Sequence, residues 1–542
     1  MRGIALCAVV IASCGGGGKA KPGDAAGNGD SGPPPPPPAP TCTPPVMPVD
    51  TSHPDHVVGD GTAASCTQAA LATAIAAGGT ITFSCGTAPV TIAITQTLAA
   101  RTDVDTTLDG GGTVTLDGGG TAQILSFDHN NYRVNTTTLT LQHIAFAHGR
   151  AHGTKMYAQA PAPCSQGYYD GYAGAVYMKD GQLVVIDATF EANEAESLGP
   201  DVGGGAIALL GCKHAVIVGS VFHANKGANG GAIASLNSDF DVYNTAFADN
   251  VAEGNGANGD DASMCSVLAD NGQHQTGSGG NGGAVVIDGG SDGVHTFCGS
   301  VFTNNTGGAA ALGGALFRTP DLAKQPTVID RCTFDGNRGE SGGAAYFHNS
   351  ALTITASTFS NNTSMKSSGA LQADGTTFAL TNDTFTGNAA LAGLGGAIAL
   401  FGGDGAITFT TFSGNHADGG DPYFGAAIAG NAPLTLTSDI FANNTALNSG
   451  APMQCHVMGT GEGNVQWPRT HVIGGAADAP CTPTTTFADP LLGALGSNGG
   501  PTDTLVPGAG SPAIGAGVNC PATDQRGRTR PAMGCSSGSV EP

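Results

Sequence analysis

The sequence predicts an all-β protein built as a right-handed parallel β-helix, a solenoid in which each turn of the chain stacks on the one before. Three observations predict it: a Phe-x-x-Asn motif that recurs along the chain, a Gly-Gly-Ala motif that precedes it, and short strands with alternating apolar residues between the two. A fixed internal period indicates one long repeat array rather than several separate domains.

The Phe-x-x-Asn motif sets the period, because successive motif Phe residues are mostly 25 to 32 residues apart. Phe side chains at equivalent places of stacked turns are expected to form one file in the core. The Asn residues are expected to adopt left-handed turns and to form a ladder of amide hydrogen bonds. The motif occurs at Phe190/Asn193, Phe222/Asn225, Phe247/Asn250, Phe302/Asn305, Phe334/Asn337, Phe359/Asn362, Phe385/Asn388, Phe412/Asn415 and Phe441/Asn444.

The strands are predicted from stretches such as "LTITASTF" (352–359) and "LTLTSDIF" (434–441), in which apolar and small polar residues alternate. Alternation with a period of two is typical of strands with one buried face. No hairpin-length returns separate them, so each strand is expected to pair in parallel with its copy one repeat later. The Gly pair that begins each repeat lets the backbone bend where a Cβ would clash.

A short helix is predicted in "CTQAALATAIAAGG" (66–79), with Leu71, Ala74 and Ile75 on one face and Gly78 as its terminator. A solenoid exposes its core at an open end, so this helix is expected to cap the first turn. The alternative is an Ala-rich helix that does not dock. A leucine-rich repeat would have a similar period, but the Leu-x-x-Leu-x-Leu pattern that it needs is absent.

The first residues, "MRGIALCAVVIASC", resemble a bacterial lipoprotein signal peptide of residues 1–13 that is cut before Cys14, whose thiol then carries lipid. An ordinary secretory signal is the alternative. Residues 14–56 are rich in Gly and Pro and are expected to form a disordered tether. Gly15 carries no charge of the kind that resembles an inner-membrane sorting signal. We therefore expect a lipid-anchored protein of the outer membrane or cell surface, with the lipid membrane as a partner.

Composition narrows the classes of partner. The net charge of -23 and the absence of a basic stripe exclude nucleic acid as an expected partner. No CxxC or HExxH signature appears, so no metal or other cofactor is expected, and we expect a monomer. Twelve of the 14 Cys residues remain after Cys7 and Cys14, an even number that favours disulfides in an exported chain. The local pairs expected are Cys66 with Cys85, Cys455 with Cys481 and Cys520 with Cys535.

Two regions resemble known families. Between Ala173 and Asn444, the alternation of Gly-Gly-Ala and Phe-x-x-Asn resembles the polymorphic outer membrane protein repeat, within the pectin-lyase-like group of β-helices. The tail resembles the choice-of-anchor Q domain through "NGGPT" (498–502), "GSPAI" (510–514) and "DQRG" (524–527). The resemblance implies a β-helix over 57–475, cap included, and a C-terminal module over 476–542. Polymorphic outer membrane proteins continue into a translocating barrel, which is absent before Pro542, so we expect the N-terminal lipid to be the anchor.

Catalysis is the alternative function to test, because parallel β-helices include polysaccharide lyases and glycoside hydrolases. The hydrolases that this fold resembles use clustered carboxylates on neighbouring coils, and of their motifs only Asp260-Asp261 is present. The lyases need a cationic base and usually several Asp residues that bind calcium, which scattered Lys and Arg residues do not reproduce. We therefore assign no catalytic residue.

Three long loops leave the repeat at the same phase: 150–172, 194–202 and 251–281. Equal phase on a solenoid places them along one edge. They gather aromatic and polar side chains in a chain that is otherwise poor in aromatics, and such a combination is typical of sugar-binding surfaces. The candidate ligand-binding residues are Tyr157, Tyr168, Tyr169, Asp170, Tyr172, Asp260, Asp261 and His274.

Three functions remain open. The preferred one is a non-catalytic surface lipoprotein for adhesion or for binding polysaccharide or matrix. The second is a carbohydrate-active enzyme, a polysaccharide lyase or glycoside hydrolase, with its site in the three loops. The third is a purely structural spacer whose loops only cover its surface, with Cys164 and Cys265 pinning them by disulfides.

Overall fold

The structure is a computed structural model that describes residues 32–156, 167–256, 278–290, 293–320, 324–419, 424–447, 453–471 and 474–542. The description concerns the compact unit Pro34–Pro542. Among the described residues, no helix has both the length and the apolar character needed to cross a bilayer. The predicted signal peptide and Cys14 lie outside the described residues.

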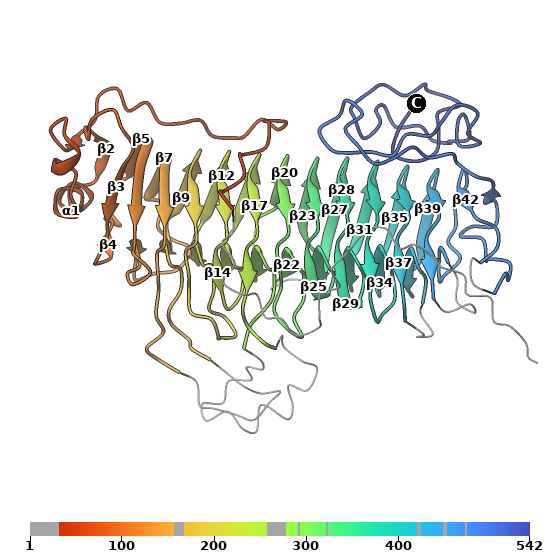
Figure 1. Cartoon of the computed structure of the whole chain (residues 1–542), viewed down its shortest axis with the longest axis horizontal. Helices are drawn as coiled ribbons and strands as arrows, with labels where there is room; N and C mark the ends of the chain where they lie inside the picture. The colour runs from red at the N-terminus through yellow and green to blue at the C-terminus, as the bar shows by residue number, and fades with distance from the viewer. Residues whose placement is uncertain are drawn as a thin grey trace, which may run out of the picture. The chain divides into compact units, whose positions relative to one another are not determined.

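The protein is all-β, with long parallel sheets along which each strand pairs with its counterpart one repeat later (Figure 1). One repeat is called a coil here, and the coils together are called the coil stack. The arrangement is consistent with a parallel β-helix. Two columns of strands share the largest sheet, a third column forms an 11-stranded sheet, and shorter strands form two small sheets.

The first column of the large sheet contains β1 (His56–Val58), β2 (Gly79–Phe83), β5 (Thr106–Asp117), β7 (Thr138–Ala147), β9 (Gln182–Ile186), β12 (His214–Val218), β16 (Phe240–Tyr243), β20 (His295–Cys298), β23 (Gln325–Asp330), β27 (Ser350–Thr355), β31 (Thr377–Thr381), β35 (Asp404–Thr408) and β39 (Leu434–Thr437). The second column contains β3 (Val90–Ala93), the later parts of β5 and β7, β10 (Thr189–Glu191), β13 (Val221–His223), β17 (Ala246–Ala248), β21 (Val301–Thr303), β24 (Thr333–Asp335), β28 (Thr358–Ser360), β32 (Thr384–Thr386), β36 (Thr411–Ser413), β40 (Ile440–Ala442), β42 (Val465–Trp467) and β43 (Thr486–Phe487).

The 11-stranded sheet contains β4 (Leu98–Ala99), β6 (Leu125–Asp128), β8 (Val176–Lys179), β11 (Ile207–Leu210), β15 (Ile233–Leu236), β19 (Val285–Asp288), β22 (Leu316–Thr319), β26 (Ala345–His348), β30 (Leu371–Asp374), β34 (Ile398–Phe401) and β38 (Ile428–Gly430). The small sheets contain β14 (Lys226–Gly227) with β18 (Val251–Ala252), and β25 (Arg338–Ser341), β29 (Thr363–Ser367), β33 (Ala389–Ala390), β37 (His416–Ala417) and β41 (Thr445–Ala446).

A file of Phe rings runs through the core, as the sequence predicts. It extends from Phe146 to Phe441, with one motif Phe contributed by each coil between them, and neighbouring ring centroids are 4.6–5.2 Å apart with nearly parallel planes. The spacing follows from strand pairing, because Phe334 pairs with Phe359 and Phe359 with Phe385 in strict register. Every ring of the file is fully buried.

The predicted Asn ladder also forms. The side-chain oxygen of Asn362 accepts hydrogen bonds from the backbone N–H and the amide of Asn337, at 3.0 and 2.9 Å. The Asn362 amide donates to Asn388 Oδ1 and to the backbone oxygen of Phe334, both at 2.9 Å. The same pattern links the motif Asn residues from Asn193 to Asn444, so each buried amide is satisfied by the neighbouring coils.

The left-handed turn is one residue away from where the sequence analysis puts it. The residue before each motif Asn has positive φ, for example Asn361 at 55° and Gly387 at 65°, whereas the motif Asn does not. In the Gly pair, the first residue supplies a positive φ, as at Gly342 (68°). The second is Gly because a Cβ on Gly343 would lie 2.0 Å from the backbone oxygen of Gly369 in the next coil.

The capping helix is confirmed as α1 (Gln68–Ala77), which contacts β1, β2 and β4 of the first coils. Its buried residues are the predicted Leu71, Ala74 and Ile75. Thr67 caps its N-terminus by accepting a hydrogen bond from Ala70 N–H, and Gly78 ends it with a φ of 79°.

Residues 41–56, which the sequence analysis assigns to the disordered tether, lie along one edge of the coil stack and are called the strap (Figure 1). The strap runs against the order of the coils: Asp55 N–H donates to Thr80 O of β2, Val49 pairs with Gln142 of β7, and Cys42 pairs with Asn244 after β16. The coils contribute the side chains of Gln142 and Asn244 to these bonds, and the composition of 14–56, rich in Gly and Pro, gives no indication of them.

The residues after β43, 488–542, are called the C-terminal segment and cover the same edge further along the stack (Figure 1). The left-handed residues Ala356 and Asn382 of two successive coils contact different parts of the segment: Thr502 Oγ1 donates to Ala356 O, and Asn382 Nδ2 donates to Thr523 O. The sheet pairing continues to β43, and Cys481 is bonded to Cys455, so contacts cross the boundary expected at 475/476.

The three expected local disulfides, Cys66–Cys85, Cys455–Cys481 and Cys520–Cys535, are confirmed. A fourth, Cys42–Cys298, joins residues 256 apart in sequence and was not expected. The even number of cysteines favours disulfides, but Cys212 and Cys332 are free and buried. Both lie in the same core cluster, where a thiol fills space as a small apolar group. Cys164 and Cys265 lie outside the described residues.

Candidate ligand-binding site

The three loops start at the same corner of successive coils. Arg150 pairs with Glu194, Glu194 with Lys226, and Lys226 with Val251. Because these bridges are parallel and lie one coil apart, the first residues of the loops follow one edge, as predicted. Arg150 and Glu194 also form an ion pair.

The described parts of the loops hold one another in place. Loop 194–202 lies between the others: Leu198 O accepts a hydrogen bond from Tyr168 N–H at 2.8 Å, and Gly199 N–H donates to Ser278 O at 3.0 Å. Glu196 Oε2 accepts from Gly153 N–H at 3.0 Å. The described parts of the three loops therefore contact one another and form one connected surface.

Asp170 shapes the first loop. Its carboxylate accepts from the N–H and hydroxyl of Thr154 and from Lys155 N–H, at 2.6–2.8 Å. Burial opposes ionisation of Asp170, but these hydrogen bonds outweigh it and lower the pKa of its carboxyl. Asp170 is thus an ionised turn former. Tyr168 is also structural, because its ring packs so closely on Gly153 that a Cβ there would lie 2.3 Å from it.

A depression of about 590 Å³ lies between the first loop and the preceding coils. Its aromatic wall is formed by Tyr169, Tyr172 and Tyr177, and the ring centroids of Tyr172 and Tyr177 are 6.2 Å apart. Tyr177 projects outward from β8, whereas Tyr169 is 45% exposed at the rim. Its polar lining comprises Thr95, Gln96, Thr97, Thr121, Gln123, Asp128, Arg150, His152 and Asp170. This depression is called the tyrosine pocket.

Two contacts fix the floor of the tyrosine pocket. Gln123 Nε2 donates to the backbone oxygens of Tyr172 and Ala173, both at 2.9 Å, and so ties the end of the loop to the preceding coil.

Asp128 lies 3.9 Å from Lys179 Nζ and remains half exposed. Burial, and then the negative charge of Asp128, raise the pKa of the Tyr177 hydroxyl to about 12. Tyr177 therefore keeps its proton and offers a neutral hydroxyl.

Of the predicted site residues, the structure brings Tyr169, Asp170 and Tyr172 together in the tyrosine pocket, whereas Tyr168 is outside its lining and packs on Gly153. Tyr157, Asp260, Asp261 and His274 lie outside the described residues. The sequence analysis did not select Tyr177, Gln123, Asp128 or Arg150 as site residues. Alternation in "AVYMK" (175–179) could have indicated that Tyr177 faces outward, but no sequence signal shows which outward residues lie beside a loop.

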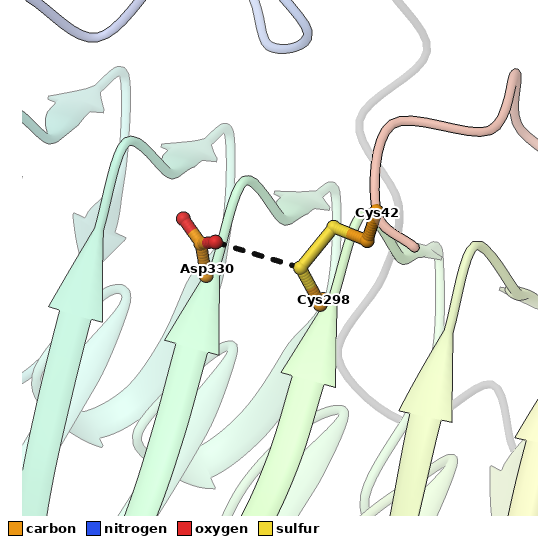
Figure 2. A group of neighbouring side chains, drawn as sticks. All are labelled: Cys42, Cys298 and Asp330. Carbon is orange, nitrogen blue, oxygen red and sulfur yellow. Dashed lines mark hydrogen bonds between the residues drawn. A yellow bond between two sulfur atoms is a disulfide. The ribbon is translucent and has the colours of Figure 1, made fainter. Parts of the chain in front are cut away.

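Another depression, of about 730 Å³, lies where the end of the strap meets the coil stack and the C-terminal segment. Its side chains are committed to holding these parts together: Arg331 bonds to Asp330 and to Thr41 O, and Asn382 bonds to Thr523 O and Arg530. Among the described residues, one trio, Cys42, Cys298 and Asp330, has metal-ligand spacing, but its two sulfurs are bonded to each other and offer no thiolate (Figure 2).

No protein-family model matches the chain, and no curated protein matches it. The resemblance to the two families therefore rests on the motifs of the sequence.

Proposed function

We propose that the protein is an exported, lipid-anchored surface protein that binds a polysaccharide or cell-surface glycan at the tyrosine pocket without cleaving it. The proposal takes the coil stack as a right-handed parallel β-helix of the polymorphic outer membrane protein repeat type, with a C-terminal segment of the choice-of-anchor Q type. The observation that carries the binding role is the tyrosine pocket.

The composition of the tyrosine pocket suits a sugar. A pyranose has apolar C–H faces that stack on aromatic rings, and hydroxyl edges that need donors and acceptors in the same plane. Tyr169 and Tyr172 offer the rings, while Asp128 offers a carboxylate and Gln123 offers the carbonyl oxygen of its amide in the same lining. The chain's net charge of -23 favours a neutral or cationic glycan over an acidic one.

The same groups argue against catalysis. A hydrolase needs a carboxylic acid whose pKa is raised so that it can protonate the leaving oxygen. Asp170 has a lowered pKa, and the pKa of Tyr177 is raised to about 12, so neither described group exchanges a proton readily near neutral pH. Binding is therefore the function we prefer for this pocket.

Screening the full chain in detergent against a glycan array tests the binding role. Tyr169→Ala is expected to lower the affinity for the bound glycan about tenfold, because one stacking ring is lost. Tyr132→Ala is the matched control: Tyr132 is also 45% exposed but lies outside the pocket, beside Gly211. Equal losses in both variants would place glycan binding outside the tyrosine pocket, and no glycan bound by the wild-type chain would leave the spacer role instead.

The anchor needs its own test. Cys14→Ala is expected to move the protein from the membrane fraction to the soluble fraction, and mass measurement of the wild-type N-terminal peptide is expected to show acyl chains. Membrane association that persists in Cys14→Ala, together with an unmodified wild-type N-terminus, would contradict lipid anchoring while leaving glycan binding untouched.

A further inference from the structure

The strap is fastened to the coil stack most firmly at one end. Cys42 is bonded to Cys298, the last residue of β20, near the middle of the stack (Figure 1). Beside this bond, Asn244 Oδ1 accepts from Thr41 and Cys42 N–H, and Asn244 Nδ2 donates to Cys42 O at 2.8 Å. The opposite end of the strap lies beside β2, where Asp55 bonds to Thr80.

Between these ends the strap is held mainly by hydrogen bonds: Val49 bonds to Gln142 through both its N–H and its oxygen, and Thr51 Oγ1 donates to Asp109 Oδ2 at 2.7 Å. Little of its apolar surface is buried, because Met47 is 76% exposed and Val49 is 40% exposed. An apolar depression of about 420 Å³ lies beneath Pro44–Pro48, over Ile186 and Val218 of the sheet. Val46 packs on Ile186 and Val218, but the rest of this stretch buries little apolar surface to offset the entropy of ordering it, so the covalent bond at Cys42 contributes strongly to holding the strap.

The Cys42–Cys298 bond differs from the other described disulfides in what it joins. Those link residues 19, 26 and 15 apart within the two ends of the unit, whereas this one spans 256 residues. Breaking a local link leaves its segment held by the neighbouring coils. Breaking this one frees the strap.

The surroundings of Cys298 suit the reduced state. Arg331 Nη2 lies 3.4 Å from Cys298 Sγ, and Asp330 Oδ2 lies 3.5 Å from it (Figure 2). A disulfide sulfur has no hydrogen to donate, so the contact with Asp330 becomes a hydrogen bond only when Cys298 is a thiol. Arg331 can donate to the thiolate that forms first.

We propose that the Cys42–Cys298 disulfide is a redox-sensitive latch, which decides whether the N-terminal segment leaves the coil stack at its middle or at its N-terminal end. The thiolate of a small dithiol attacks Cys42 Sγ, the S–S bond breaks, and Cys298 leaves as a thiolate beside Arg331. The second thiol of the reductant then attacks the mixed disulfide and releases Cys42. Overall, the dithiol is oxidised to a cyclic disulfide, and its two electrons and two protons pass to Cys42 and Cys298.

Opening the latch moves the exit point of the chain from beside β20 to beside β2 and uncovers Ile186 and Val218. This consequence for the attachment of the protein rests on the proposed lipid anchor. The latch itself does not, because it concerns contacts within residues 41–298.

The test is a titration of the full chain with dithiothreitol, followed by alkylation, mass spectrometry and amide hydrogen exchange. Cys42 and Cys298 are expected to be alkylated at reductant concentrations that leave the three local disulfides intact, and amides of residues 41–56 are expected to exchange at least tenfold faster. The free Cys212 and Cys332 do not interfere, because burial raises the pKa of each thiol to about 12.

The latch is wrong if a local disulfide is reduced at the same concentration or earlier, or if the strap stays protected after Cys42 and Cys298 have reacted. Cys42→Ser is expected to give the fast exchange of the strap without reductant, whereas Cys520→Ser, which removes a local bond, is expected to leave strap exchange unchanged. If Cys42→Ser does not fold, the wild-type titration still decides. Membrane fractionation and glycan binding are read separately, so failure of the proposed function does not resemble failure of the latch.

Discussion

Phe385 and Arg530 are both buried, but they are held in different ways. Phe385 contacts the same residue type on each side, with ring centroids of Phe359 and Phe412 at 4.7 and 5.2 Å. Arg530, in the C-terminal segment, bonds to Asn382, Ser536, Gly538 and Glu541 and lies over the ring of Phe409. The interior is thus stabilised by one contact repeated in every coil, whereas the covering segments are stabilised by contacts that each occur once.

This difference predicts which part of the protein a substitution destabilises. A substitution in the Phe file removes contacts with the coil on each side, whereas a substitution in a covering segment releases that segment and leaves the coils paired. The predictions that follow test this contrast.

The largest loss is expected from Phe385→Ala, which opens a cavity in the Phe file. It is expected to lower the free energy of unfolding by about 3–5 kcal/mol, measured by urea denaturation. Tyr169→Ala, at an exposed ring, is expected to change it by less than about 0.5 kcal/mol. Equal effects of the two substitutions would break the assignment of the Phe file to the core.

The Asn ladder is the next target. Asn362→Ala removes the acceptor for two donors of Asn337 and the donor to Phe334 O, and is expected to cost about 2–4 kcal/mol. Asn361→Gly is the matched neighbour: Asn361 has a φ of 55°, which Gly adopts without strain, and the substitution removes one exposed hydrogen bond to Asp335, so its effect is expected to stay within about 1 kcal/mol. Urea denaturation of both variants sharpens the distinction between the ladder residue and the turn residue.

Arg530→Ala tests a covering segment. Loss of its buried contacts is expected to destabilise the C-terminal segment by about 2–3 kcal/mol. Limited proteolysis is expected to cut within 488–542, while the far-ultraviolet circular dichroism of the coil stack stays unchanged. Loss of the coil-stack signal at the same time would show that segment and interior unfold together, and the contrast would fail.

The smallest effect concerns pH. Asp383 and Asp439 occupy turns just before the Phe file and are buried, each with one carboxylate oxygen lacking a hydrogen-bond partner among the described residues. Burial raises the pKa of both carboxyls well above 3.8, against the hydrogen bonds from Ser357 and Thr410 N–H. The folded chain therefore holds protons that the unfolded chain releases above pH 3.8, so the free energy of unfolding falls as the pH rises from about 4 toward the raised pKa values.

The double variant Asp383→Asn and Asp439→Asn is expected to remove most of this fall. Urea denaturation is expected to show the variant more stable than the wild type at pH 7 and the two nearly equal at pH 4. A wild-type stability that rises with pH between 4 and 7 and does not differ from that of the variant would contradict the buried, protonated state.

The repeated parts of the fold could be predicted because the same residue types recur at the same positions in each coil. Phe and Asn at fixed spacing and Gly before each strand mark the core, the turn and the close approach of backbones. The left-handed position was misplaced by one residue, because Asn is common in such turns and the residue before it varies among Ala, Asp, Asn and Gly. The repeated Phe and Asn can be recognised in spite of this variation, but the residue with positive φ cannot, because its type changes from coil to coil.

The unique parts could not be predicted in the same way. Cys42 and Cys298 lie 256 residues apart, and no local pattern indicates that they meet. In the tyrosine pocket, Tyr169 and Tyr172 were found from the concentration of aromatics in one loop. Gln123 and Asp128 were missed because they come from the preceding coil, and their proximity depends on how that loop folds back.

If the tyrosine pocket binds a glycan and leaves it intact, binding and the mass of the glycan can be measured on the same sample. The full chain is incubated with the glycan that the array identifies, and calorimetric titration is followed by mass spectrometry of the recovered glycan. The account predicts saturable binding, weakened about tenfold by Tyr169→Ala, and a glycan of unchanged mass after prolonged incubation. Shortened or unsaturated products, formed by the wild type and lost in Tyr169→Ala, would contradict it and assign a carbohydrate-active enzyme instead.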